Sequence, residues 1–312
     1  MSRRSATDLC GVLAVDKPAG MTSHDVVAAV RRVSGEGRVG HAGTLDPMAT
    51  GLLVVLIGPA TRLAPYLTAA RKSYDARITF GAATDTDDAD GQVTERCVVP
   101  PAVTDKQFAS AMLSRLPGTH LQMPPAFSAI KKDGVPAYSV ARKGGEVVLE
   151  EREITVDVAT LSRIEPGPPP SWECSFTVSK GTYIRALARD LGRESACCAH
   201  LSALRRTASG TLAVASAHTL TSLPNDRAAL RCLFSDPLDA LDFPALHIAG
   251  QAVAHVIVGR TLVAEEVGAT ELPDGPCAVV AGGLVLGIYQ KAGSRLRPAA
   301  IMPPATRLET AR

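Results

Sequence analysis

The feature that most constrains the fold is a set of short segments in which apolar and polar residues alternate. The clearest covers residues 73–80, where Tyr74 and Phe80 fall on one face and charged or hydroxyl side chains fall on the other. Residues 154–158 and 172–178 repeat the pattern. The longest strongly apolar run, residues 52–57, has only six residues, which is typical of a buried strand. These segments predict sheets with a covered face, and they place Tyr74 on that face.

Helical spacing occurs at two places between the predicted strands. Thr22 and Ser23 are N-cap residues for a helix in which valines recur at helical spacing until Gly35, and the opposite face of this helix is basic. A second helix begins near Ile184, turns its leucines inward and ends near Gly192. Strands and helices together predict a protein of the α+β class.

The length of the chain predicts two domains. At roughly 150 residues per domain, 312 residues allow one sizeable core and a smaller partner. The chain becomes a mixed connector after residue 220, and strand-like segments follow, so we expect a larger domain at 1–240 and a small, mostly β domain at 245–312. Residues 124–152 are basic and punctuated by glycine and proline, which predicts a long functional excursion.

The overall charge is nearly balanced, with 33 Lys and Arg against 31 Asp and Glu. Such a balance argues against a strongly basic coat for nucleic acid. The charges are segregated, however, because four acidic residues crowd into 85–90 while basic residues occur in pairs elsewhere. These pairs are Arg31-Arg32, Lys131-Lys132, Arg142-Lys143 and Arg205-Arg206. The sequence therefore predicts a local basic track.

The apolar segments are far too short for a membrane span, which needs roughly 20 apolar residues. At the N-terminus, Arg3 and Arg4 precede a short apolar stretch that lacks a small-residue cleavage site. We therefore expect a cytoplasmic protein without a transmembrane helix.

Three patterns suggest a metal, a disulfide or a nucleotide, and each fails on its spacing. The seven cysteines are scattered without a C-x-x-C pair, so neither a disulfide framework nor a zinc site is predicted. Residues 85–91 lack the ligand order of an EF-hand, which favours a solvated hairpin loop. Residues 35–40 match G-x-G-x-x-G but follow a helix and lack the acidic partner of a dinucleotide site, which favours a flexible glycine loop.

The most informative single residue is Asp46, which lies in a loop punctuated by glycine at 40, 43 and 51. Such a loop lets a carboxylate and a ligand approach closely. Taken alone, Asp46-Pro47 is also typical of a turn, and His41, Tyr74, Tyr183 and Arg185 each fit a structural role. Taken together, these side chains and the Lys- and Arg-rich excursion are what a site needs to stack a base, hold phosphates and supply one nucleophile.

An ordered series of motifs over about residues 11–215 resembles the bacterial TruB-type tRNA pseudouridine-55 synthases. The motifs are Gly11-Val-Leu-Ala-Val-Asp-Lys17-Pro-Ala-Gly20-Met-Thr-Ser23, Val39-Gly-His41-Ala-Gly-Thr-Leu-Asp46-Pro-Met-Ala-Thr-Gly51, Lys72-Ser-Tyr74, Gln122-Met-Pro-Pro125, Ser128-Ala-Ile-Lys131, Ser179-Lys-Gly-Thr-Tyr183-Ile-Arg185 and Leu204-Arg-Arg206. The resemblance implies a pseudouridine-synthase fold, in which a mixed, mainly antiparallel sheet is flanked by helices, followed by a small PUA-like domain. One departure is Cys197-Cys198, which occupies a stretch that is usually rich in glycine.

The resemblance also implies a reaction and its catalytic residues. Asp46 corresponds to the nucleophile of a uridine-to-pseudouridine isomerisation that uses no cofactor and no metal. Arg185 corresponds to the residue that orients this carboxylate and lowers its pKa. Tyr74 corresponds to the tyrosine that packs on the target base and is discussed as a proton acceptor.

The remaining implied residues bind the substrate, which is the T-stem-loop of tRNA. The target uridine must flip out of the folded loop; His41 corresponds to the residue that fills the space it leaves, and Tyr183 and Leu204 line its pocket. Lys17, Lys131 and Lys132 complete the implied substrate-binding set, the last two on a thumb-like insertion at about 124–152.

The resemblance further implies a monomer that needs no membrane and no guide RNA, and whose C-terminal domain contacts the acceptor end of tRNA. Two alternatives stay open at this point. One is an RNA-binding or tRNA-folding module that does not catalyse, and the other is a guide-dependent relative. The presence of Asp46, Tyr74 and Arg185 favours the enzyme, because binding alone does not need the carboxylate.

Overall fold

The computed structural model describes residues 7–128, 131–132, 135–136, 149–241 and 243–302. By its internal contacts, the chain divides into two compact units. The first unit consists of residues 1–46, 51–70 and 209–312, and the second consists of residues 47–50 and 71–208. Every helix in the described part is too short or too polar to cross a bilayer.

The N-terminal sheet of the first unit is centred on β3 (Thr50–Ile57). β1 (Gly11–Lys17) pairs antiparallel with it from Gly11↔Ile57 to Lys17↔Gly51, and β2 (Val39–His41) pairs with its other edge. The short β14 (His218–Thr219) lies parallel to β1. Seven consecutive residues of β3 are buried, as its unbroken apolar run predicts for a strand covered on both faces.

Helix α1 (Ser23–Ser34) begins and ends where the sequence predicts. The Thr22 side chain accepts the backbone N–H of Asp25, and the Asp25 carboxylate accepts the N–H of Thr22, which forms a reciprocal capping box. Gly35 ends the helix with φ 66°, a left-handed conformation that suits glycine. The segment after it is not a flexible loop: Glu36 is buried, and its carboxylate accepts hydrogen bonds from Thr7 at 2.7 Å and from the Arg38 N–H at 2.9 Å.

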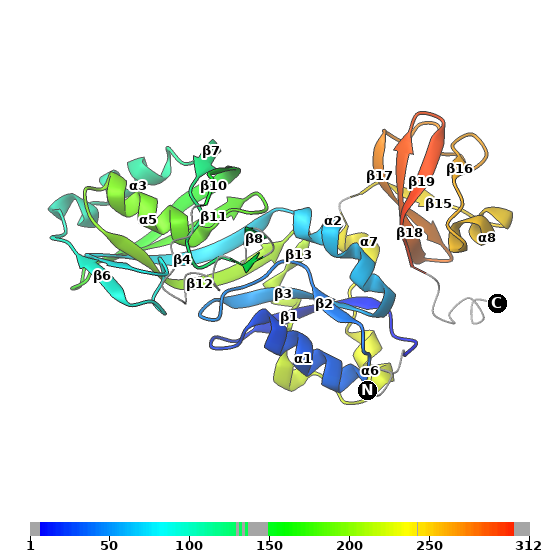
Figure 1. The fold of residues 1–312 in the computed structure, drawn as a ribbon, viewed down its shortest axis with the longest axis horizontal. Coiled ribbons are helices and arrows are strands. Elements are labelled where there is room, and N and C mark those ends of the chain that lie inside the picture. Colours follow the sequence, from blue (N-terminus) through cyan, green and yellow to red (C-terminus); the bar gives the residue numbers. More distant parts are fainter. Residues whose placement is uncertain (1–6, 129–130, 133–134, 137–148, 242, 303–312) are drawn as a thin grey trace. The chain divides into compact units, whose positions relative to one another are not determined.

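A second, five-stranded sheet of the first unit confirms the expected small β module near the C-terminus (Figure 1). Its strands, in spatial order, are β15 (Ala245–His247), β17 (Gly275–Ala281), β18 (Leu284–Ala292), β19 (Arg295–Ile301) and β16 (Leu262–Val263), with helix α8 (Gln251–Ile257) beside them. The fully buried Tyr289 donates its hydroxyl to the Arg260 carbonyl at 3.0 Å.

Short elements complete the first unit. They are α2 (Ala64–Ala69), β13 (Leu212–Ala213), α6 (Arg227–Cys232), α7 (Pro237–Ala240) and the 3-10 helices η1 (Gly58–Leu63), η3 (Val214–Ser216) and η4 (Leu220–Ser222).

The second unit is built on an open sheet whose neighbouring strands are β12, β4, β11, β10 and β7. These strands are β12 (Ala199–Ser209), β4 (Lys72–Phe80), β11 (Ser171–Val178), β10 (Arg152–Glu165) and β7 (Gly118–Gln122). The pairs β4–β11, β11–β10 and β10–β7 are antiparallel, and the alternating segments of the sequence lie on them as predicted.

Helices α3 (Lys106–Leu113) and α5 (Ile184–Glu194) lie against this sheet (Figure 1). The core between them centres on Trp172, which is fully buried and donates its indole N–H to the Val103 carbonyl at 2.7 Å. The ring of Phe80 lies 4.6 Å from the Trp172 ring, between centroids. The 3-10 helix η2 (Pro101–Thr104) carries the carbonyl that Trp172 uses.

The basic excursion at 124–152 lies largely outside the described residues. Its described part includes the short pair β8 (Lys131–Lys132) and β9 (Val135–Pro136). The side chains of Lys131 and Lys132, and all of Arg142 and Lys143, lie outside what the structure describes.

A hairpin of β5 (Ala82–Thr84) and β6 (Val93–Arg96) carries the acidic segment 85–90 in its loop. The hairpin is as predicted, but the expected solvation of its loop holds only in part, because Asp85 and Asp90 are exposed whereas Asp88 is buried. Asp88 is only 5% exposed, and Asp87 is held in an ion pair. Both residues turn toward α5 because its arginines offer the partners that buried carboxylates require.

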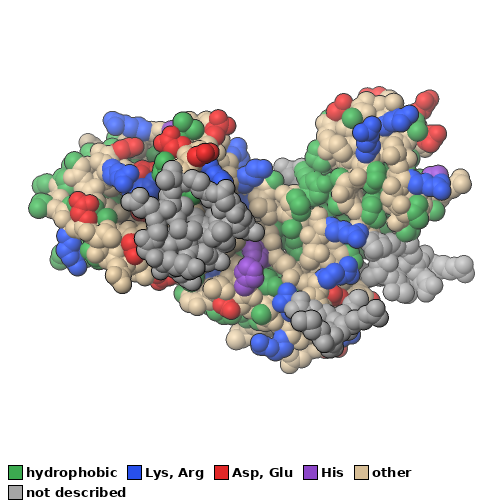
Figure 2. All heavy atoms as spheres, viewed as in Figure 1, with side chains coloured by type: hydrophobic (Ala, Val, Ile, Leu, Met, Phe, Trp, Pro, Cys, Tyr) green, Lys and Arg blue, Asp and Glu red, His purple; other side chains and the backbone are tan. Residues whose placement is uncertain are grey.

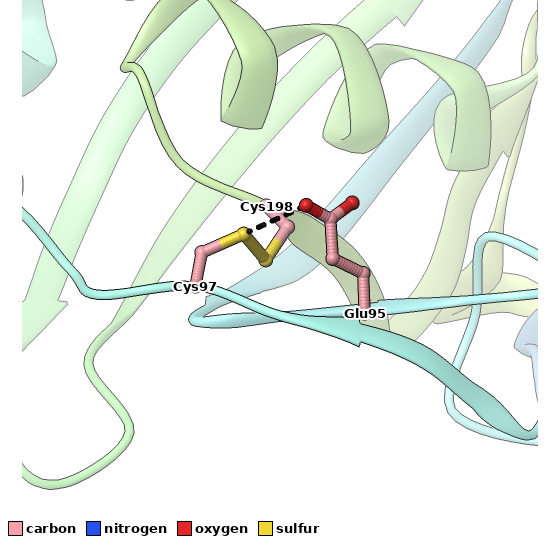
Figure 3. Close-up of side chains that lie close together, drawn as sticks. All are labelled: Glu95, Cys97 and Cys198. Carbon is pink, nitrogen blue, oxygen red and sulfur yellow. Dashed lines mark hydrogen bonds between the residues drawn. A yellow bond between two sulfur atoms is a disulfide. The ribbon is translucent and has the colours of Figure 1, made fainter.

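A disulfide joins Cys97 and Cys198 (Figure 3), which overturns the prediction that the chain contains none. Cys97 follows β6, and Cys198 precedes β12. Gly81 brings the two segments together, because its N–H donates to the Cys198 carbonyl and its carbonyl accepts from the Cys97 N–H. The two cysteines lie 101 residues apart, so their pairing depends on tertiary structure that spacing alone does not reveal.

Candidate active site

The loop that carries Asp46 is held by its backbone on the β2 side. The Ala42 N–H donates to the Val54 carbonyl at 2.9 Å, which ties the start of the loop to β3. Next to Asp46, both the N–H and the carbonyl of Leu45 bind the hydroxyl of Ser23. Asp46 itself is half-buried. The loop thus presents a carboxylate from a backbone fixed to α1 and β3.

Lys17 lies at the end of β1 and is fully buried. Its ammonium group donates to the Pro18 carbonyl at 2.9 Å and to the Met21 carbonyl at 2.7 Å. Both acceptors belong to the turn between β1 and α1. Lys17, which the resemblance assigns to substrate binding, therefore stabilises the turn that leads into α1.

His41 ends β2, opposite Val55 of β3. Its ring meets the ring of His24, from the first turn of α1, edge to face, with 5.7 Å between centroids and an interplanar angle of 86°. The half-buried His41 is therefore positioned by the sheet on one side and by a second histidine on the other.

Arg185 occupies the first turn of α5 in the second unit and is only 4% exposed. Its guanidinium donates to the Thr86 carbonyl at 2.8 Å and to the Phe127 carbonyl at 2.9 Å, and its Nε lies 3.5 Å from Asp88 Oδ2. These contacts fix the plane of the guanidinium between α5 and the acidic hairpin loop.

Asp88 is a functional candidate that the sequence reasoning missed. Besides Arg185, its carboxylate accepts from the Thr86 hydroxyl at 2.6 Å and from the Asp90 N–H at 3.1 Å. The sequence signal is the dense cluster of aspartates itself, whose spacing does not fit a calcium loop. A buried cationic partner is an equally good reason for such a cluster.

One turn along α5, Arg189 makes a second contact with the same loop. It binds Asp87 Oδ2 at 3.0 Å, Asp190 at 2.9 Å and the Met123 carbonyl at 2.8 Å. Burial raises the pKa of Asp87, and the two arginines oppose this effect. The loop is thus attached to α5 by two ion pairs.

Tyr74 lies on β4 opposite Phe176, and the guanidinium carbon of Arg206 lies 5.7 Å from the centre of its ring. This is the range of a cation–π contact. Two residues earlier, Lys72 is only 6% exposed, and burial together with the charges of Arg206 and Lys180 lowers its pKa to about 8. The sequence reasoning did not assign these cations, although Lys72 and Arg206 lie within the quoted motifs.

Tyr183 and Leu204 are both held through their backbones. The side-chain amide of Gln122 brackets Tyr183, because it accepts the Tyr183 N–H at 2.9 Å and donates to the Tyr183 carbonyl at 3.1 Å. The carbonyl of Leu204, on β12, accepts the hydroxyl of Thr50 at 3.4 Å. The backbone of each residue is therefore held by a neighbour in the second unit.

The predicted site residues are divided between the two units. Lys17, His41 and Asp46 belong to the first, whereas Tyr74, Tyr183, Arg185 and Leu204 belong to the second. Within each unit, contacts along the described chain hold every one of them in a defined place.

Two family profiles match consecutive parts of the chain. Residues 31–184 match the profile described as "TruB family pseudouridylate synthase (N terminal domain)", and residues 185–241 match "tRNA pseudouridylate synthase B C-terminal domain". Among curated proteins, "tRNA pseudouridine synthase B" of Opitutus terrae is 49% identical over 69% of this chain and 88% of its own. The protein of the same name from Mycobacterium bovis is 42% identical over 95% of this chain and 97% of its own.

Solved structures agree on the fold. A crystal structure of a Cbf5-Nop10-Gar1 complex contains a chain that matches with a TM-score of 0.73 and 25% identity, covering 94% of this chain and 85% of that one. These similarities confirm the expected combination of mixed sheets, flanking helices and a small C-terminal β module.

Proposed function

The chain belongs to the TruB family of pseudouridylate synthases, and on that premise we propose that it isomerises uridine to pseudouridine at position 55 in the T-loop of tRNA. The observation that carries this proposal is Asp46, a half-buried carboxylate on a loop fixed by its backbone, in the motif where the family has its nucleophile. The catalytic names of the relatives favour an enzyme over a module that only binds RNA.

The reaction rearranges one nucleoside without adding or removing atoms. The carboxylate of Asp46 supplies the nucleophile, and the bond between C1' and N1 of the uridine breaks. The uracil turns within the pocket, and a bond forms between C1' and C5. The proton on C5 leaves, and N1 gains a proton, so the product is an isomer of the substrate. Tyr74 is the proposed acceptor of the C5 proton.

Arg185 is the second member of the proposed catalytic set. A guanidinium can pair with a carboxylate through two hydrogen bonds and fix its orientation, which is the role proposed for Arg185 toward Asp46. The support for this role is that Arg185 is buried and that two carbonyls and Asp88 already fix its orientation. A pre-oriented guanidinium has little conformational entropy left to lose in the complex.

The target uridine lies inside a folded loop, so binding must expose it. We propose that Tyr74, Tyr183 and Leu204 line the pocket of the flipped base and that His41 fills the space left in the loop. The support lies in their side-chain chemistry, since aromatic rings stack on bases and a leucine closes a pocket without competing hydrogen bonds.

Phosphate contacts are assigned to basic side chains outside this pocket. Lys131 and Lys132 on the thumb-like insertion at about 124–152 are proposed to hold the stem-loop. Lys17 completes the proposed substrate-binding set from a buried position, where it supports the turn before α1 rather than a phosphate. On the face drawn in Figure 2, Lys and Arg side chains are interspersed with Asp and Glu. This distribution suits an enzyme that must release its product better than a tight, general RNA coat.

The proposed organisation is a catalytic domain at 1–240 and a PUA-like RNA-binding domain at 245–312 that contacts the acceptor end of tRNA. We propose that the protein acts as a cytoplasmic monomer without a guide RNA. Gel filtration with light scattering and an assay without added RNA cofactors test the last two statements.

The central test uses purified protein and an unmodified tRNA transcript. Pseudouridine is mapped by carbodiimide labelling after incubation with the wild type or with Asp46→Asn. We expect a single labelled stop at position 55 with the wild type and none with the variant. A wild type that binds tRNA without modifying it would instead support a binding or folding module, and a fully active Asp46→Asn would remove the proposed nucleophile.

A further inference from the structure

We propose that Ser23 is a positioning residue for the reaction: its buried hydroxyl holds the backbone of Leu45 and thereby sets the direction in which the Asp46 carboxylate points. This inference rests on the proposed function, because it concerns the residue next to the proposed nucleophile. Ser23 does not touch the reacting atoms in this account, so its role is indirect.

The geometry is a two-point clamp made by one hydroxyl. Ser23 Oγ accepts the Leu45 N–H at 2.9 Å and donates its proton to the Leu45 carbonyl at 3.1 Å. Ser23 is only 1% exposed and Leu45 only 3%. In the described residues, this hydroxyl is the hydrogen-bond partner of both backbone groups of Leu45. Without it, a buried N–H and a buried carbonyl would lose their partner, which the fold tolerates poorly.

The start of α1, which carries the Ser23 hydroxyl, is rigid. Ser23 is the first residue of α1, and the capping box of Thr22 and Asp25 already satisfies the start of the helix. The hydroxyl of Ser23 is therefore not needed as a cap and turns inward. The turn before the helix is braced by Lys17, whose ammonium group binds two of its carbonyls. Ser23 thus projects from a fixed point.

The other side of the clamp is the Asp46 loop, whose glycines leave its backbone free to move unless other contacts restrain it. Gly43, with φ 93°, lies two residues before Leu45, and Gly51, with φ 97°, follows Asp46 by five residues. Glycines at such positions keep wide backbone freedom in the absence of other restraints. The Ala42–Val54 hydrogen bond fixes the loop before Gly43, and the Ser23 clamp fixes it again immediately before Asp46. A rotation of the Leu45 peptide would redirect Asp46 directly.

A displaced nucleophile slows the chemical step more than it weakens binding, because the remaining contacts to the RNA are unaffected. A misplacement of about 1 Å can cost about 100-fold in rate. We therefore expect Ser23→Ala to lower the single-turnover rate of pseudouridine formation by about 10- to 100-fold at saturating enzyme. The dissociation constant for tRNA should stay within about twofold of the wild type.

Ser34→Ala is the matched control. Ser34 lies on the same helix and is also fully buried, and its hydroxyl likewise accepts a backbone N–H, that of Glu36, at 3.2 Å. It lies at the opposite end of α1 from the Asp46 loop. A general loss of helix stability would slow both alanine variants alike, whereas loss of positioning slows only Ser23→Ala. All rates are measured well below the melting temperature of each variant.

A second pair keeps the proposal falsifiable if Ser23→Ala does not fold. Ser23→Thr keeps the hydroxyl, and Ser23→Val replaces it with a methyl group of similar shape. We expect Ser23→Thr to react at least tenfold faster than Ser23→Val. Equal rates in this pair, or a Ser23→Ala variant that is as fast as Ser34→Ala, would overturn the inference. Wild type and Asp46→Asn are run alongside, so failure of the proposed function appears separately as an inactive wild type or an active Asp46→Asn.

Discussion

The Asp46 loop and the Asp85–Asp90 loop both carry aspartate between two strands, yet the contacts that hold them differ. The first is tied down through its backbone, at Ala42 and at Leu45. The second is also tied down through its backbone, because Asp87 and Ala89 exchange hydrogen bonds with Leu201 of β12. In addition, the carboxylates of Asp87 and Asp88 bind the arginines of α5. The carboxylates of Asp87 and Asp88 thus serve to orient arginines, whereas Asp46 carries the carboxylate that is proposed to meet the substrate.

After loss of the nucleophile, Asp88→Asn is expected to have the largest effect on stability and activity. The variant removes a charge beside the buried Arg185, and disrupting a buried ion pair commonly costs about 3 kcal/mol. We expect the free energy of unfolding to fall by about that amount and the rate of modification to fall by about 100-fold. Urea unfolding and single-turnover assays measure the two effects.

Asp46→Asn is the matching variant in the other loop. Its free energy of unfolding should fall by less than that of Asp88→Asn, because Asp46 is half-buried whereas Asp88 is nearly fully buried, although its activity is lost. If Asp46→Asn destabilises the protein as much as Asp88→Asn does, the two loops are not held differently and the comparison fails.

The disulfide is a further attachment of the acidic hairpin, at its base. Because Cys97 and Cys198 close a long loop, Cys198→Ser should lower the free energy of unfolding by about 2–4 kcal/mol. A dithiol reductant should have the same effect on the wild type and little on the variant. Cys232→Ser, which changes an exposed free cysteine, is the control. Equal unfolding midpoints for oxidised and reduced wild type would show that the bridge does not stabilise the hairpin.

A smaller effect concerns pH. The pKa of Lys72 is lowered to about 8 in the folded protein, whereas its ordinary value is 10.5. Between these values the unfolded chain binds more protons, so the Lys72 contribution makes the free energy of unfolding rise with pH from about 8 to 10.5. Wild type should therefore gain stability relative to Lys72→Met over this window. Denaturant unfolding of both proteins at pH 7 to 10.5 tests this, and a constant difference would contradict the assigned pKa.

The smallest expected effect is on RNA affinity. Lys131→Glu combined with Lys132→Glu should weaken tRNA binding and reduce the slope of its salt dependence, because fewer counterions are released from the phosphates. Binding titrations at several salt concentrations measure the slope. An unchanged slope would remove the thumb-like insertion from the account.

The sequence predicted those parts of the fold that depend on local patterns. The limits of α1 follow from Thr22, Asp25 and Gly35, which act within one helical turn. The strand character of β4 follows from its alternation, and that of β3 from its apolar run. Each of these signals is complete within about a dozen residues.

The features that the sequence did not predict depend on distant partners. Asp88 and Arg185 lie 97 residues apart, and their aspartate-rich segment taken alone is typical of a solvated loop. The inward position of Lys17 depends on the turn that it braces, whereas lysine as a residue type is usually exposed. In the candidate site, composition and spacing alone are consistent with Asp46 being an ordinary turn residue. Only the resemblance to a family assigns a reaction to it.

The most direct test of the central claim measures the loss of the C5 hydrogen that any uridine-to-pseudouridine isomerisation requires. A tRNA transcript carrying tritium at C5 of its uridines is incubated with excess enzyme, and the released tritium is counted. We predict release equivalent to one uridine per tRNA with the wild type and none with Asp46→Asn. Release at the wild-type rate by Asp46→Asn, or no release by the wild type, would contradict the account.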